Sequence, residues 1–325
     1  MPADYSFVIP IFNERETLEE LYQRLQPVMS ALDGPSEIIF VDDGSDDGSH
    51  DIMRKLHERD ARVKVVRLSR NFGHQIALTA GLDHAEGKAV ITMDGDLQDP
   101  PEVVPELARR WKEGYDVVYA EREERAGESR TKLATARWFY RLMGRVSDVD
   151  LPSEVGDFRL VDRRVLDAVS AMPEHRRYLR GMFAWVGYDQ STVHYARAPR
   201  YRGKTKFPMR KMMAFALDGI VSFSSAPLRL ALKFGFVVSV LSFMLGITAV
   251  VVRLGGFFAV PGWASIAVGV AFLGGVQLTV LGVIGEYIAG IYDEVKQRPL
   301  YLVRERSGLD RVIDARGTSP TRRLE

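Results

Sequence analysis

Residues 89–101 read AVITMDGDLQDPP, and this stretch indicates both the fold and the position of a site. The apolar run 89–93 does not alternate with polar residues, which is typical of a strand buried on both faces of a parallel sheet. Asp94, Asp96 and Asp99 follow it directly. Because like charges repel at such close range, crowded carboxylates at the end of a buried strand require an explanation.

Similar apolar runs lie on either side of this stretch and alternate with helical patterns. The runs are residues 5–10, 37–41, 63–68 and 116–120, and the helical patterns lie near 15–32, 48–60, 74–86 and 101–113. This alternation predicts a doubly wound α/β domain with a mostly parallel sheet, in which ligands bind beyond the carboxyl ends of the strands. Three of the four loops after the first four strands carry acids. Residues 183–196 are predicted to form a further strand pair.

Two long segments near the C-terminus carry no charge. They are Phe234–Val252, of 19 residues, and Leu254–Gly285, of 32 residues. Since a membrane span needs about 20 apolar residues, we predict two transmembrane helices at about 233–253 and 263–286. The alternative is a buried helical hairpin in a soluble core, but a soluble helix of this length rarely lacks a polar face.

The charges around this pair predict its orientation. Basic residues precede and follow it, whereas the connecting loop holds only Arg253, so the positive-inside rule places both ends in the cytoplasm. No cleavable signal peptide is expected at the N-terminus. We therefore predict an integral protein of a bacterial inner membrane. The chain is predicted to have four parts. They are a cytoplasmic domain (1–208), amphipathic helices in the membrane interface (209–232), the two-helix hairpin (233–286) and a cytoplasmic tail (287–325), disordered from Ser307. The alternative for the second part is packing on the soluble domain.

The composition excludes some chemistry. The 325 residues carry a formal net charge of +1 and include no cysteine. Disulfides, thiolate metal sites and cysteine nucleophiles are therefore excluded. We expect no nucleic acid among the partners.

The acids after residue 93 fit a metal site. Asp94 and Asp96 offer hard oxygen ligands of the kind that Mg²⁺ or Mn²⁺ favours, and such ions also bind substrate phosphates. Gly95 would let the backbone approach a ligand closely, and Gln98 could add a neutral oxygen. Asp99, before two prolines, is predicted to cap the next helix. The alternative is a solvated acidic turn.

A second acidic loop, VDDGSDDGS, ends the strand at 37–41. Carboxylates at Asp42 and Asp43 could accept hydrogen bonds from the ribose or base of a nucleoside, as an acid does in dinucleotide-binding folds. Asp46, Asp47 and Ser49 are predicted to cap the following helix. No GxGxxG follows the first strand, which makes a nicotinamide cofactor a weak interpretation.

A basic run supplies the opposite charge. Residues 197–211 contain seven basic residues and no acid. They could bind phosphates by charge-assisted hydrogen bonds, or attract anionic lipid headgroups. Arg122, after the fifth strand, is a further candidate for a phosphate contact.

Six segments in order resemble family 2 glycosyltransferases of the GT-A fold. They are VIPIFNE, VDDGSDDGS, NFGHQIALTAGLDHAEG, MDGDLQDPPE, GDFRLVDRRV and RYRGKTKF. The resemblance covers about residues 4–300. Within the family, the chain more narrowly resembles the branch that transfers sugars to polyprenyl phosphates. That branch includes dolichyl-phosphate mannose synthases and bacterial undecaprenyl-phosphate glucosyltransferases, and two C-terminal spans are typical of its bacterial members.

The resemblance implies a role for each matching position. The nucleoside-binding set is Pro10, Phe12, Glu14, Asp42, Asp43 and Asp94; the metal set is Asp94, Asp96 and Gln98; the acceptor-phosphate set is Arg122, Arg200, Arg202 and Lys206. Asp157 matches the candidate base, although it could instead orient the sugar or only pair with Arg159. Thr205 replaces the Ser that is usual in the basic loop. His74 is expected to be structural or to lie near the donor sugar.

The implied reaction is an inverting transfer of a sugar from a nucleotide sugar to a polyprenyl phosphate at the cytoplasmic face of the bilayer. The first choice of donor is UDP-glucose, and the first choice of acceptor is undecaprenyl phosphate. GDP-mannose and a UDP-linked amino sugar are the alternative donors. A non-catalytic, membrane-tethered nucleotide-binding module is the alternative of another class. A processive polysaccharide synthase is disfavoured, since the QxxRW motif is absent. Glycines at 269, 274, 275 and 282 could let membrane helices pack within one chain or in a homo-oligomer.

Overall fold

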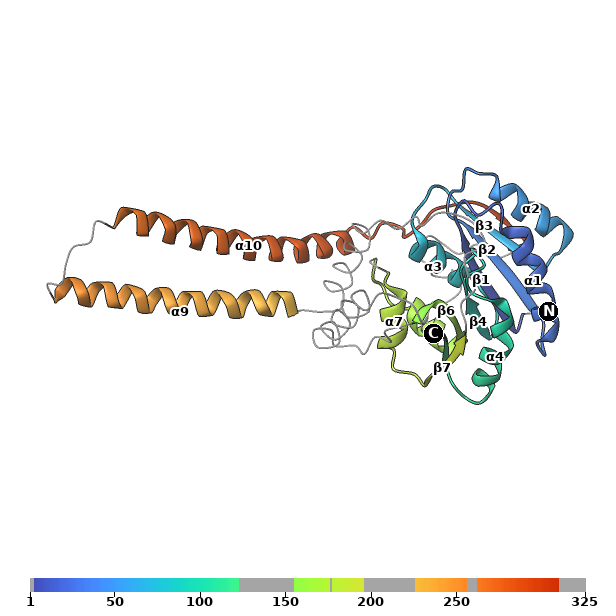
Figure 1. Ribbon diagram of the computed structural model, residues 1–325. Helices are drawn as coiled ribbons and strands as arrows, with labels where there is room; N and C mark the ends of the chain where they lie inside the picture. Colours follow the sequence, from blue (N-terminus) through green and yellow to red (C-terminus); the bar gives the residue numbers. More distant parts are fainter. Residues whose placement is uncertain (1–2, 123–154, 176, 196–225, 256–261, 310–325) are drawn as a thin grey trace, which may run out of the picture. The chain divides into compact units, whose positions relative to one another are not determined.

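The computed structural model describes residues 3–122, 155–175, 177–195, 226–255 and 262–309 (Figure 1). These residues form two compact units. The sheet unit holds the described residues up to 195 together with 298–309, and the helical unit holds those from 226 to 297. The predicted interfacial segment is 209–232, and its residues 209–225 lie outside the described residues.

The sheet unit is built on one mixed sheet with the order β7-β5-β6-β4-β1-β2-β3-β8. Its strands are β1 (Tyr5–Ile11), β2 (Ser36–Asp42), β3 (Val63–Leu68), β4 (Ala89–Thr92), β5 (Val117–Arg122), β6 (Val155–Asp162), β7 (Gln190–Tyr195) and β8 (Val303–Ser307). The four central strands, β4-β1-β2-β3, are parallel, whereas β6 and β8 run antiparallel to their neighbours. The predicted α/β fold with its parallel strands is confirmed.

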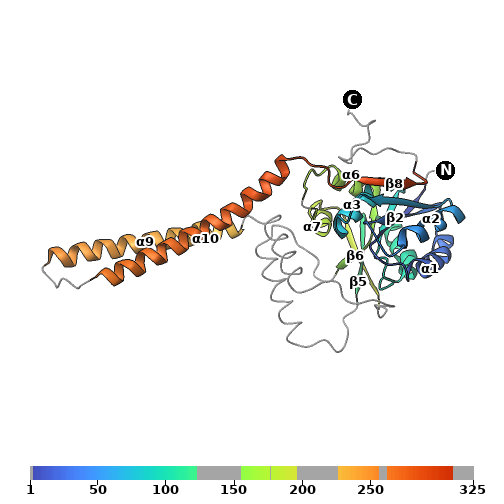
Figure 2. The same cartoon turned by 90° about the horizontal axis from the view of Figure 1, so that it is seen from above.

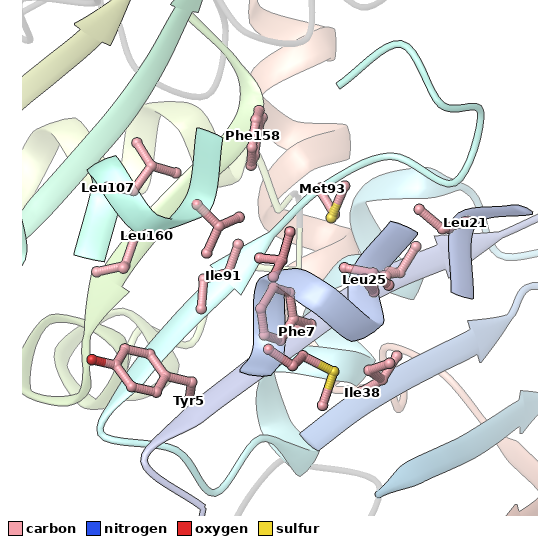
Figure 3. Close-up of a cluster of buried hydrophobic side chains, with 14 of the residues drawn as sticks. Tyr5, Phe7, Leu21, Leu25, Ile38, Ile91, Met93, Leu107, Phe158 and Leu160 are labelled. Atoms are coloured by element: carbon pink, nitrogen blue, oxygen red, sulfur yellow. The ribbon is translucent and has the colours of Figure 1, made fainter. Parts of the chain in front are cut away.

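Helices cover both faces of this sheet. They are α1 (Leu18–Ala31), α2 (Ser49–Arg59), α3 (His74–His84), the 3₁₀ turn η1 (Pro101–Val103) leading into α4 (Val104–Lys112), α6 (Arg163–Ser170) and α7 (Leu179–Trp185). Alternate strand residues such as Phe7, Ile38 and Ile91 pack against Leu21 and Leu25 of α1 in one core (Figure 3).

The opposite face of the sheet packs against α3. A Cβ on Gly81 would lie 2.3 Å from Cγ1 of Val8, so α3 approaches the sheet as closely as glycine allows. Every residue of β1 is buried because both of its faces are covered. The mostly apolar sequence of that strand has this physical origin.

Three features of the sheet unit differ from the sequence expectation. The predicted strand pair at 183–196 is wrong in its first half, because residues 179–185 form α7 and only 190–195 form a strand. The sequence analysis did not foresee β6. Nor did it foresee β8, which lies within the segment expected to be a tail and pairs with β3.

The helical unit consists of α9 (Ala226–Leu254) and α10 (Trp263–Val295), which lie side by side in Figures 1 and 2. Within them, Leu230–Thr248 and Phe272–Val295 are long and apolar enough to cross a membrane, and neither stretch is buried. A hairpin in a soluble core would bury these side chains, so the exposed apolar surface favours membrane association. Both helices exceed the predicted spans: α9 begins within the predicted interfacial segment, and α10 continues past residue 286.

Candidate active site

The carboxyl ends of the central strands meet at one edge of the sheet. Ile11 pairs with Asp42, and Asp42 pairs with Arg67, so β1, β2 and β3 end level with one another. The loops that follow are joined by hydrogen bonds. The hydroxyl of Thr17 donates to the carbonyl oxygen of Gly95 at 2.9 Å, which ties the loop after β1 to the loop after β4.

The antiparallel strand β6 brings Asp157 to the same edge. Thr92, the last residue of β4, pairs with Arg159, so the first residues of β6 lie beside the loop that follows β4. The hydroxyl of Thr92 also donates to the carbonyl oxygen of Asp157. This pairing joins the GDFRL and DGD motifs, which the sequence separates widely.

The Asp157 carboxylate is held by three side chains. Its Oδ2 lies 3.0 Å from Nε2 of His74 and accepts from Nε2 of Gln75 at 3.0 Å, while its Oδ1 accepts from Nη2 of Arg159 at 2.9 Å. Burial opposes ionisation, but the His74 bond and the charges of Arg159, His74 and Arg180 outweigh it and lower the Asp157 pKa. Asp157 is therefore ionised and a weak proton acceptor.

Arg159 is fully buried beneath this carboxylate. Its guanidinium carbon lies 5.4 Å from the ring centre of Tyr119 and 5.1 Å from that of Phe183. Burial lowers the Arg159 pKa, and the charge of Asp157 counteracts this effect. The pair is thus a buried ion pair between aromatic rings, and no sequence pattern marks Arg159 as different from the surface arginines around it.

His74 links Asp157 to the predicted metal site. Its Nε2 lies 3.6 Å from Oδ1 of Asp94. Burial disfavours the charged ring, but the bond to Asp157 and the charges of Asp94, Asp157 and Asp43 raise the His74 pKa to about 9. The sequence analysis assigned His74 no chemistry, because its carboxylate partners come from distant strands.

The DGD loop carries more negative charge than its surroundings neutralise. The side chain of Asp94 is 36% exposed. Burial raises its pKa to about 7; His74 opposes this rise, and the charges of Asp99, Asp157 and Asp96 add to it. Asp96 accepts from the backbone N–H of Gln98 at 3.1 Å.

The backbone of this loop is constrained. Leu97 has a φ of 62°, a left-handed conformation that is strained for a bulky residue. A Cβ on Gly95 would lie 2.4 Å from Cδ1 of Ile11, so a larger residue here would have to displace the end of that side chain. That Gly95 lets the backbone approach a ligand stays a prediction.

Asp99 does not cap a helix, and that prediction is wrong. Pro100 occupies the cap position of η1, and no side chain bonds there. Asp99 is buried, and its Oδ1 accepts from the hydroxyl of Tyr195 at 2.8 Å and from Nη2 of Arg122 at 3.4 Å. Nε of Arg122 also donates to the Tyr195 hydroxyl at 3.1 Å. Asp99 and Tyr195 therefore hold Arg122 at the edge of the DGD loop.

The Asp42 and Asp43 carboxylates are bound within the protein. Asp42 accepts from the backbone N–H of Ser45 at 2.8 Å. Asp43 accepts from the backbone N–H groups of Phe72 and Gly73 at 2.7 and 2.9 Å. These two residues therefore set the shapes of the loops after β2 and β3.

The remaining predicted nucleoside residues lie on β1 and the loop after it. Pro10 is buried in β1, Phe12 is 39% exposed, and the backbone N–H of Glu14 donates to Oγ of Ser49 at 3.1 Å. The cap position of α2 is Gly48 and no side chain bonds there, so the prediction that Asp46, Asp47 and Ser49 cap this helix is wrong. Asp47 accepts from the N–H and the hydroxyl of Ser49. Asp46 instead bonds to the side chain of Asn13.

The residues at the β4 end fit a divalent cation only in part. Among the described residues, no three histidine or acidic side chains form a metal-binding group. Asp94 and Asp96 supply two carboxylates, and Mg²⁺ or Mn²⁺ in such a place completes its coordination with waters and substrate phosphates. The surplus of carboxylates around Asp94 is the observation that fits a cation. Arg200, Arg202 and Lys206 lie outside the described residues.

Comparisons with known proteins show which family the chain resembles. The profile of "Glycosyl transferase family 2" matches residues 6–170. An uncharacterised glycosyltransferase of Synechocystis sp. is 47% identical over 95% of this chain and 98% of its own. A prophage-derived bactoprenol glucosyl transferase of Shigella flexneri is 42% identical over 92% of this chain and 97% of its own. The solved glucosyl-3-phosphoglycerate synthase of Mycobacterium tuberculosis is 23% identical, with a TM-score of 0.43 over 67% of this chain and 78% of that one. The chain belongs to glycosyl transferase family 2.

Proposed function

We propose that this protein transfers a glucosyl group from a nucleotide sugar to a polyprenyl phosphate. The observation that carries the proposal is the partly exposed carboxylate pair Asp94 and Asp96 at the sheet edge, with Arg122 held beside it. The relative from Shigella flexneri, named as a bactoprenol glucosyl transferase, supports the choice of glucose and of a lipid acceptor. UDP is the nucleotide that we propose for the donor.

The donor would lie across the ends of β1, β2 and β4. The loops shaped by Asp42 and Asp43, together with Pro10, Phe12 and Glu14, would surround the nucleoside. Asp94, Asp96 and Gln98 would hold Mg²⁺ or Mn²⁺, which when bound stabilises charge on the leaving diphosphate. Arg122 would offer a fixed positive charge to the acceptor phosphate, because Asp99 and Tyr195 orient its guanidinium.

The reaction exchanges one bond for another at the anomeric carbon. An acceptor phosphate oxygen forms the new bond to this carbon from the face opposite the diphosphate. The bond to the diphosphate oxygen breaks with its electron pair, so the configuration inverts. A phosphate monoester has a second pKa of about 6 and is largely ionised at neutral pH, so the step needs no strong base.

Asp157 would therefore act by orientation. Its lowered pKa and its three hydrogen-bonded partners make it a poor proton acceptor. It holds His74 next to Asp94, and Gln75 next to the start of α7, whose Leu179 N–H donates to Oε1 of Gln75 at 3.2 Å. A rigid arrangement of this kind maintains the geometry in which the donor sugar meets the acceptor.

The helical unit would anchor the enzyme where its lipid acceptor resides. The basic residues on both sides of α9 and α10 favour a cytoplasmic sheet unit. Arg200, Arg202 and Lys206 would bind the lipid phosphate next to the bilayer. A homo-oligomer stays a prediction. No described atom lies within 4 Å of a Cβ added at Gly269, Gly274, Gly275 or Gly282, so these glycines do not mark a close helix contact within the described chain.

Transfer to lipid tests the proposal directly. The full chain, purified in detergent, is incubated with undecaprenyl phosphate and radiolabelled UDP-glucose, with Mn²⁺ or with a chelator. We expect label in the organic phase with the metal and none with the chelator. A panel of UDP-linked amino sugars and GDP-mannose tests the donor. Donor binding without transfer of any of these sugars would favour the non-catalytic module.

A further inference from the structure

The strand that follows the two apolar helices belongs to the sheet unit. β8 pairs antiparallel with β3 at the edge of the sheet (Figure 2). The backbone N–H of Ser69, directly after β3, donates to the carbonyl oxygen of Leu302 at 2.8 Å. Tyr301 is 2% exposed, and its hydroxyl donates to Oδ2 of Asp83 in α3 at 2.9 Å. The segment leading into β8 is thus fixed both to the strand and to a helix of the sheet unit.

A line of polar side chains runs from β8 to the loop after β2. Oε2 of Glu305 lies 3.4 Å from Nε2 of His50, and Nδ1 of His50 lies 3.4 Å from Oδ2 of Asp42. Nε of Arg67 lies 3.3 Å from the same oxygen, and Arg67 pairs with Glu305 in the ladder. His50 and Arg67 thus stand between two carboxylates, one in the sheet interior and one on the C-terminal strand.

This arrangement matters because of where Asp42 lies. Its side chain is 0% exposed, and that of His50 is 11% exposed. A buried carboxylate is stable only when positive or hydrogen-bonding groups compensate it. Oδ1 of Asp42 receives the Ser45 N–H. Among the described residues neither Oδ2 of Asp42 nor Nδ1 of His50 has a hydrogen bond, so Oδ2 relies on close contact with His50 and Arg67. The position of the imidazole therefore affects the loop that begins at Asp43.

Glu305 restrains that imidazole from its other nitrogen. Its side chain is 45% exposed, so it adds little to the hydrophobic core. Its effect is directional: a carboxylate at Nε2 favours the ring orientation in which Nδ1 faces Asp42. Without it, Asp42 is the one carboxylate that an ion pair joins to the ring in the described part of the chain.

We infer that Glu305 is a positioning residue for the donor-nucleoside loop, acting through His50 on Asp42. The inference rests on the proposed function, in which the loop after β2 lines the nucleoside pocket. If the inference holds, the chain beyond the apolar helices contributes to donor binding. A sheet unit that ended before α9 would lack Glu305 and its effect on the loop after β2.

Nucleotide affinity of the full-length chain in detergent tests the inference. UDP and GDP are titrated by calorimetry in the presence of Mn²⁺, with wild type, Glu305→Gln and the control Arg304→Gln, an exposed residue of the same strand. We expect Glu305→Gln to weaken nucleotide binding about threefold to tenfold, the range of a modest coupling between contacting residues. Acceptor KM should not change, Glu305→Asp should recover part of the affinity, and Arg304→Gln should bind as wild type does.

A double-mutant cycle with His50→Gln tests whether Glu305 acts through His50. If Glu305 acts through His50, the loss in Glu305→Gln/His50→Gln is smaller than the product of the two single losses. Wild-type affinity in Glu305→Gln, or a double variant whose losses simply multiply, would overturn the inference. A lower melting temperature with unchanged affinity would also overturn it, since that result describes a purely structural strand.

The variant Asp42→Asn separates this inference from the proposed function. If Asp42→Asn weakens nucleotide binding and Glu305→Gln does not, only the role of Glu305 is wrong. If Asp42→Asn binds UDP and GDP as wild type does, the assignment of the loop after β2 to the nucleoside fails first.

Discussion

Two pairs of carboxylates lie at the same edge of the sheet, one at the end of β2 and one at the end of β4. Asp42 and Asp43 are 0% and 3% exposed and accept hydrogen bonds from loop backbone. Asp94 and Asp96 are only partly buried, and neighbouring carboxylates help to raise the Asp94 pKa. The first pair is bound by loop backbone, and Asp42 also lies beside His50 and Arg67, whereas burial and the neighbouring carboxylates disfavour the charged form of Asp94.

The difference teaches how to separate acids that build a site from acids that bind a ligand. Both pairs follow an apolar strand, and both are equally crowded in sequence. What distinguishes them is whether donors from other segments reach the carboxylate oxygens. A carboxylate whose oxygens are already bonded orders its loops, whereas a surplus of charge is available to a cation.

The largest expected effect is at the β4 pair. Asp96→Asn removes a ligand charge without changing the volume of a partly exposed side chain, so the fold should remain intact. Transfer should fall by about a hundredfold or more, because a bound metal contributes several kcal/mol to charge stabilisation. Lipid labelling measures the loss, and the exposed Glu58→Gln is the matched control. Activity close to wild type would remove Asp96 from the metal site.

The next largest effect concerns Asp157. Asp157→Ala leaves the buried Arg159 without its carboxylate, which should lower the free energy of unfolding by about 3 kcal/mol. Transfer should fall more than donor binding. The double variant Asp157→Ala/Arg159→Met should regain stability in denaturant unfolding but not transfer. Equal losses of transfer and donor binding in the double variant would reduce Asp157 to a structural role.

Asp42→Asn should have an intermediate effect, on stability and donor affinity and not on the metal. The change removes the charge that faces Arg67 and His50, so the free energy of unfolding should fall by about 2 kcal/mol. Donor affinity should weaken, while the dependence of transfer on metal concentration stays as in wild type. A shift in that metal dependence would contradict the contrast between the two pairs.

The smallest expected effect is at Tyr195. Tyr195→Phe removes one hydroxyl that bonds both Asp99 and Arg122. A lost hydrogen bond of about 1 kcal/mol corresponds to a roughly fivefold loss of transfer, and acceptor KM should carry most of it. Tyr188→Phe serves as the control. If acceptor KM stays constant, Arg122 does not meet the acceptor.

Much of the fold was predictable because it depends on local patterns. The largely apolar runs at 5–10, 37–41, 63–68 and 89–93 correspond to β1 to β4, since strands covered on both faces are mostly apolar. β6 and β8 were missed for the opposite reason. β6 interleaves charged residues with apolar ones, and β8 reads VRERS, which a partly exposed edge strand tolerates.

The candidate site divides in the same way. Asp94, Asp96 and Asp157 could be named from their motifs, but Gln75, His50 and Glu305 could not. Each of these three gains its role from a partner far away in the chain, and nothing in its own neighbourhood in the sequence indicates that partner. The role assigned to Asp99 was wrong because two prolines suggested a helix cap, whereas its carboxylate turns toward Tyr195.

The sequence by itself determined the layered α/β unit, the two apolar helices and the strand ends where acids gather. These follow from hydrophobic periodicity and from the rule that ligands bind at the carboxyl ends of parallel strands. Only the tertiary structure decided which acids bond to loop backbone or basic side chains and which lie among other carboxylates. That decision depends on groups from β3, β6, α2 and α3 and from the loops between them, and the chain brings them to the sheet edge only when the whole unit has folded.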